Sequence, residues 1–128
     1  AEVQPSDCGT RLRLSADAQT LYAMIATPAS APSEKDTLTL LLSPDMDSPP
    51  TTIAINLATA ELQNAPPNTR AVKGTDGIEL ALPLQTLGMK GSLLLNVVRQ
   101  RNDRLSYWLG NGASYQNPLV FARLILPD

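Results

Sequence analysis

Short runs in which every second residue is apolar recur along this chain, and they constrain its fold more than any other feature. In residues 78–82 (IELAL), Ile78, Leu80 and Leu82 alternate with Glu79 and Ala81. A period of two places successive side chains on opposite faces of a β-strand. The segments between the runs hold most of the 11 prolines and 7 glycines, which favour turns. The chain is therefore predicted to be all-β.

The runs predict about eight or nine strands and at most one short helical turn. The turn is expected at residues 83–88 (PLQTLG), where a proline stands at the start and a glycine at the end. Because strands do not alternate with helices, a parallel sheet is not expected. The predicted fold is an antiparallel β-sandwich of two sheets, immunoglobulin-like or jelly-roll-like. The expected strands are residues 11–14, 20–27, 36–43, 51–58, 70–73, 78–82, 92–101, 104–109 and 119–126.

Length and composition exclude several classes of protein. The 128 residues suit one domain, expected at 11–128 after a lead-in at 1–10. The chain has no histidine and only one cysteine, Cys8, which argues against structural zinc, haem and histidine-dependent catalysis. A net charge of −2 argues against a nucleic-acid ligand. No apolar run approaches the roughly 20 residues of a membrane-spanning helix, so membrane insertion is not expected.

Five segments follow one another in a recognisable order: LYAMIATP, DTLTLLLSPDMDSPPTTIAIN, GIELALPLQTLG, LLLNVVRQR with LSYW, and PLVFARLIL. This series, spread over residues 11–127, resembles the carbohydrate-binding module family 9-like domains of the DOMON-like group of β-sandwiches. The resemblance implies a non-catalytic module that binds sugar. The matching positions are Asp36, Asp45, Asp47, Glu79, Pro83, Leu87, Gly88, Asn96, Arg99, Trp108, Pro118 and Phe121.

The hairpin predicted over residues 92–109 supplies a candidate binding face. If residues 102–103 form a two-residue turn, Arg99 faces Ser106 and Val97 faces Trp108. Facing residues of an antiparallel pair lie on the same side of the sheet. One side of the hairpin then carries Arg99, Arg101, Arg104, Ser106 and Trp108.

An indole beside arginines can recognise a sugar, because the ring stacks on the sugar while the guanidinium groups donate to hydroxyls or to a carboxylate. Neighbouring arginines also require acids or an anionic ligand nearby, for which Asp36 and Glu79 are candidates. Tyr115, in a polar loop, is the candidate second aromatic, whereas Tyr22 is expected to pack in the core. The alternative is that Trp108 belongs to the core and the arginines form a solvated hairpin tip.

Two acids in the turn PDMDSPP are candidate calcium ligands. Asp45 and Asp47 could each supply carboxylate oxygens to the ion. The alternative is an Asp-rich turn that caps its own backbone.

The leading hypothesis is a non-catalytic, carbohydrate-binding accessory module of a larger extracellular or periplasmic protein. An aromatic content of only 4% and a single tryptophan favour the alternative, a structural or protein-interaction domain that docks a protein partner or another domain of its parent chain. No enzyme is expected. Glycoside hydrolysis needs a pair of carboxylates, and nothing in the sequence places the candidates Glu79 and Asp36 in one site.

Overall fold

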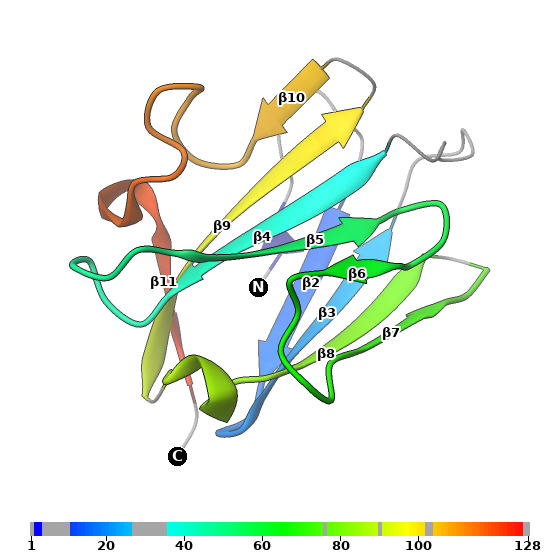
Figure 1. The fold of residues 1–128 in the computed structure, drawn as a ribbon, viewed down its shortest axis with the longest axis horizontal. Coiled ribbons are helices and arrows are strands. Elements are labelled where there is room, and N and C mark those ends of the chain that lie inside the picture. The colour runs from blue at the N-terminus through cyan, green and yellow to red at the C-terminus, as the bar shows by residue number, and fades with distance from the viewer. Residues whose placement is uncertain are drawn as a thin grey trace.

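The computed structural model describes residues 2–3, 11–26, 36–75, 77–89, 91–101 and 104–126. Within these ranges the backbone forms eleven strands and two single turns of 3-10 helix, and the strands pair antiparallel into two sheets laid one over the other (Figure 1). The predicted all-β, two-sheet sandwich is confirmed.

The first sheet, called the five-stranded sheet, has the order β1-β2-β3-β8-β7. Its first strand falls in the segment expected to be a lead-in, of which residues 4–10, with Cys8, lie outside the described residues. The strands of this sheet are β1 (Glu2–Val3), β2 (Arg11–Ala16), β3 (Thr20–Ala26), β8 (Ile78–Pro83) and β7 (Arg70–Lys73).

The second sheet, called the six-stranded sheet, has the order β10-β9-β4-β5-β6, and β11 also pairs with β9. The first half of β9 pairs with β11 and its second half with β10. The strands are β10 (Arg104–Tyr107), β9 (Ser92–Arg101), β4 (Thr37–Ser43), β5 (Thr51–Asn56), β6 (Leu62–Gln63) and β11 (Ala122–Ile125).

The main core lies between the two sheets and is built from the alternating apolar positions. In β3, for example, Leu21, Ala23 and Ile25 are buried, while Tyr22 and Met24 between them are exposed. Burial of each large aliphatic side chain stabilises the fold by about 1.5–3 kcal/mol relative to exposure. The strand residues of this core are Leu12, Leu14, Leu21, Ala23, Ile25, Leu38, Leu40, Leu42, Ile53, Ile55, Ile78, Leu80, Leu82, Leu93, Leu95 and Val97.

The predicted helical turn after β8 is confirmed as η1 (Gln85–Leu87). Gly88 ends it with a φ of 70°, a left-handed conformation that glycine adopts without a steric penalty. Pro83, expected to open the turn, instead ends β8.

The closing strand is shorter than predicted. Residues 118–120 form a second 3-10 turn, η2 (Pro118–Val120), and only Ala122–Ile125 is extended. Asn117 caps η2, since its Oδ1 accepts the backbone N–H of Leu119 at 3.1 Å. A capping asparagine followed by proline favours the start of a helical turn, and this local signal overrides the apolar strand pattern.

The hairpin between β7 and β8 brings a glycine against the neighbouring strand. Asp76, part of the predicted turn, lies outside the described residues, and Gly74 N–H donates to the Gly77 carbonyl at 2.7 Å. A Cβ at Gly77 would lie 1.9 Å from the Ile25 carbonyl oxygen, and its φ of 146° also favours glycine. The backbone of β3 therefore approaches this turn at a position without a side chain.

Candidate ligand-binding face

The register predicted for the β9–β10 hairpin is confirmed. Arg101 pairs with Arg104 and Arg99 with Ser106, and the Trp108 N–H donates to the Val97 carbonyl at 3.0 Å. The turn residues 102–103 lie outside the described ranges.

The face that carries Trp108 and Arg99 is turned inward. Val97, on the same side of β9, is fully buried in the main core, and Trp108 packs partly buried against that core. Arg99 is 1% exposed, so its guanidinium cannot meet a ligand at the surface. The prediction that Arg99 binds ligand is therefore corrected.

Arg99 forms an ion pair inside the molecule. Its Nη2 lies 3.5 Å from Asp36 Oδ2, and both side chains are almost fully buried. A buried guanidinium is costly unless a carboxylate compensates its charge. Asp36, proposed from the sequence as a neutralising acid, supplies the carboxylate that compensates the charge of Arg99.

The remaining predicted ligand residues do not share one surface. Arg101 and Arg104 are exposed at the end of the β9–β10 hairpin. Tyr115 lies on the outer side of the six-stranded sheet, where its ring centroid is 5.0 Å from that of Tyr107. The sheet therefore separates Tyr115 from Trp108, and the expected pair of aromatic residues is not assembled.

Residues 108–121 form a segment that runs over the outer side of β4 and β9, although the Trp108 side chain at its start packs on the core side. They complete a second, smaller apolar cluster, in which Phe121, Tyr115 and Val120 pack on residues of β4 and β9. Asn96, fully buried on β9, holds this segment in place. Its Nδ2 donates to the carbonyls of Leu109 and Tyr115, each at 3.0 Å, and its Oδ1 accepts the Leu109 N–H at 3.1 Å. This side of the sandwich is thus occupied by the chain itself.

In the 44–50 turn the carboxylate of Asp45 accepts a hydrogen bond from the backbone of the same turn. Asp45 Oδ1 accepts the Asp47 N–H at 3.0 Å, and Ser43 Oγ donates to the Asp45 carbonyl at 2.6 Å. The pKa of Asp45 lies below its ordinary value, chiefly because the Ser48 side chain donates a hydrogen bond to it. Within the described residues no three metal-ligating side chains gather, at this turn or elsewhere. The geometry fits a self-capping turn.

The outer side of the five-stranded sheet, called here the bare face, is lined by exposed side chains. In one row across the strands, Arg13, Met24, Glu79 and Val72 are in register. The next row consists of Ser15, Tyr22, Ala81 and Arg70.

Exposed apolar side chains accompany the charges of the bare face. Tyr22 is 44% exposed, Met24 36% and Val72 57%. Tyr22 was expected in the core, and that expectation is wrong. The signal that could have placed it outside is the unbroken apolar series Leu21, Ala23 and Ile25 on the opposite side of the same strand.

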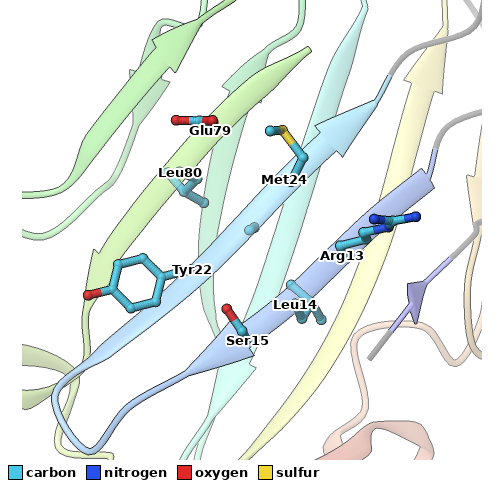
Figure 2. Close-up of a pocket in the computed structure, with 8 residues that line it drawn as sticks. Arg13, Leu14, Ser15, Tyr22, Met24, Glu79 and Leu80 are labelled. Atoms are coloured by element: carbon cyan, nitrogen blue, oxygen red, sulfur yellow. The ribbon is translucent and has the colours of Figure 1, made fainter. Parts of the chain in front are cut away.

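A depression of about 270 Å³ lies at the centre of the bare face. Figure 2 shows Tyr22, Met24, Arg13 and Glu79 around it on the outer side of the strands, while Leu14 and Leu80 lie on the core side. A second depression of about 220 Å³ shares Met24 and Glu79 with the first and continues past Val72 to Gly77. The two depressions are therefore adjacent, with Met24 and Glu79 lining both.

The ring of Tyr22 is fixed by the β2–β3 turn. Its hydroxyl donates to Asp17 Oδ2 at 3.3 Å, and Asp17 Oδ1 accepts the N–H groups of Gln19 and Thr20 at 2.8 and 2.7 Å. These hydrogen bonds hold the pKa of Asp17 below its ordinary value of 3.8, with the bond from the Gln19 backbone as the largest cause. The carboxylate that anchors the ring is therefore ionised at neutral pH.

The stabilising effect of Asp17 is expected to depend on pH. Because its pKa is lower in the folded state than the unfolded value near 3.8, the ionised group stabilises the fold above that pH. This contribution is lost as the pH falls through the lower folded pKa. In thermal unfolding between about pH 7 and about pH 2, Asp17→Asn should melt below wild type near neutrality and converge with it in acid. A gap of constant size down to the lowest pH would contradict this, and Asp47→Asn serves as the control at a different turn.

Comparisons of the chain with protein-family models, curated proteins and solved structures find no match. In the part of the chain that the structure describes, no helix has the length and apolar character needed to cross a membrane.

Proposed function

We propose that this chain is a non-catalytic, saccharide-binding accessory module of a larger secreted or periplasmic protein, and that it binds its ligand on the bare face. The observation that carries the proposal is the anchored ring of Tyr22 beside a depression with Arg13 and Glu79 at its rim. The site differs from the one expected from the sequence, whereas the class of ligand is the same.

The chemistry of the bare face suits a sugar. An exposed aromatic ring offers its face to the C–H groups of a pyranose, and the guanidinium and carboxylate groups exchange hydrogen bonds with its hydroxyls. Ser15 and Ala81, the neighbours of Tyr22 across the strands, are small and leave the ring accessible. The volume of about 270 Å³ is near the lower limit of about 300 Å³ for small-molecule sites, which suits a single sugar ring.

The absence of catalysis in this proposal is supported by the positions of the two acids considered for glycoside hydrolysis. Such a reaction needs two carboxyl groups on either side of one bond. Asp36 is buried against Arg99 between the sheets, whereas Glu79 is exposed on the bare face. The five-stranded sheet lies between them, so they cannot act on one substrate.

The test is calorimetric titration with the best ligand of a glycan array. Tyr22→Ala should weaken binding roughly tenfold, equivalent to about 1.4 kcal/mol, because the stacking surface is lost. The matched control is Leu105→Ala on β10, since Leu105 is 43% exposed but lies on the other sheet. That variant should bind as wild type does.

Two results would count against the proposal. Saccharide binding that survives Tyr22→Ala places the site elsewhere. Failure to bind any glycan favours the alternative of a protein-docking domain, for which the exposed Met24 and Val72 would then supply the apolar contact.

A further inference from the structure

We infer that the bare face selects an acidic oligosaccharide, whose carboxylate binds Arg13 and whose hydroxyls donate to Glu79. The inference rests on the proposed saccharide binding and adds the chemical class and the minimum length of the ligand.

The two charges that flank the central depression are placed by strand pairing. Arg13 on β2, Met24 on β3 and Glu79 on β8 are in register. Neighbouring strands are about 4.8 Å apart, so the Cα atoms of Arg13 and Glu79 are separated by roughly 9.6 Å with Met24 between them. Figure 2 shows both charged groups on the same side of the sheet. Arg13 and Glu79 thus place opposite charges on either side of the apolar side chain of Met24.

Neither charge is neutralised by the other. Among the described side chains an ion pair joins Arg99 to Asp36, and none joins Arg13 to Glu79. A ligand that bridges the depression can therefore satisfy both groups at once. It needs an anion at the Arg13 end and hydrogen-bond donors at the Glu79 end.

A sugar that carries a carboxylate has this combination. The planar guanidinium fork of arginine matches the two oxygens of a carboxylate through parallel N–H···O bonds. Ionised glutamate only accepts hydrogen bonds, so adjacent sugar hydroxyls are suitable partners. A neutral sugar supplies the hydroxyls but leaves the guanidinium without an anion.

The strand rows of the bare face carry charges of both signs. Three arginines, Arg11, Arg13 and Arg70, lie on the described part of this face. Glu79 is on the same rows, and Glu2 of β1 is in register with Arg13. A ligand that has both an anionic group and hydrogen-bond donors matches such a face.

The minimum length of the oligosaccharide follows from the two adjacent depressions. Met24 and Glu79 line both, and the second depression runs on past Val72 to Gly77. One sugar ring occupies the first depression, and the second has room for the next unit of the same chain.

The experiment is calorimetric titration of the chain with trimers of galacturonate, glucuronate and mannuronate and with the methyl esters of the same trimers. Esterification removes the charge and leaves the hydroxyls unchanged. At least one acid trimer should bind roughly tenfold more tightly than its ester. Arg13→Lys keeps the charge but loses the fork, and it should remove most of that preference while binding the ester as before. Arg104→Lys, an exposed arginine on the other sheet, is the matched control and should change neither affinity.

The outcomes separate this inference from the proposed function. Tyr22-dependent binding of neutral glycans and esters, with no preference for the acids, overturns the inference and leaves the proposed function standing. A preference for an acid trimer that survives Arg13→Lys also overturns it. Failure of all trimers, esters and arrayed glycans to bind overturns the proposed function itself. Circular dichroism and thermal unfolding confirm that each variant is folded, which is expected for substitutions at exposed positions.

Discussion

Replacement of Asp36 by alanine should lower the free energy of unfolding by about 3–5 kcal/mol, because it leaves the buried guanidinium of Arg99 without its carboxylate. The two groups come from distant parts of the chain, and both are almost fully buried between the sheets. Urea unfolding at neutral pH measures the loss. Asp47→Ala is the control at an exposed acid and should change stability by less than about 0.5 kcal/mol.

A double variant separates the cost of an unpaired charge from the value of the pair. Asp36→Leu combined with Arg99→Leu removes both charges and fills the space with apolar atoms. Replacement of buried ion pairs by apolar residues is often neutral or stabilising, so the double variant should be clearly more stable than Asp36→Ala alone. If Asp36→Ala loses less than about 1 kcal/mol, Arg99 must gain access to water when its partner is removed.

Replacement of Asn96 by alanine should destabilise the fold by about 2–4 kcal/mol. The amide holds the carbonyls of Leu109 and Tyr115 and the N–H of Leu109, and its loss leaves these backbone groups without their partner. Each buried polar group left unsatisfied costs about 1–3 kcal/mol, although water can reach part of this segment after the substitution.

The same variant should release the segment that covers the six-stranded sheet. Exposure of the apolar cluster of Leu41, Leu94 and Val98 would then raise the fluorescence of a hydrophobic dye such as ANS. Asn111→Ala, in the same segment, is the control, since Asn111 lies at an exposed turn and its side chain bonds locally to Ala113 and Ser114. An Asn96→Ala protein with unchanged stability and no dye binding would show that side-chain packing alone holds the segment.

The fold was predictable because most strands have one clearly apolar side. In residues 78–82 large aliphatic residues occupy every second position without interruption, so the core side of this strand follows from the period of two. The β9–β10 register was equally accessible, since two turn residues between two apolar runs fix the pairing.

The orientation of β9 was not predictable from its own residues. One of its sides carries Arg99 and the other Asn96, and both strand faces contain apolar residues. Which polar residue faces inward depends on Asp36, 63 positions earlier in the chain, and on the covering segment 108–121. A charged residue also argues against burial until its partner is known. The sequence therefore predicted an exposed Arg99, whereas this residue is buried.

Tyr22 illustrates a second limit. Tyrosine is common both in cores and on surfaces, so its type alone does not decide its position. Its neighbours indicate its position better, because Leu21, Ala23 and Ile25 occupy the core side of β3 and leave Tyr22 on the outer side.

A chain segment packs on the outer side of the six-stranded sheet, whereas the outer side of the five-stranded sheet carries exposed side chains. This difference has an evolutionary consequence. Side chains on the six-stranded sheet's outer side pack against the 108–121 segment, so a change there disturbs stability. Arg13, Tyr22 and Glu79 project from the other side with few packing partners, and substitutions at such exposed positions usually alter stability by less than about 0.5 kcal/mol. Descendants of this sequence can therefore accumulate substitutions on one side of the molecule while the opposite side preserves the fold.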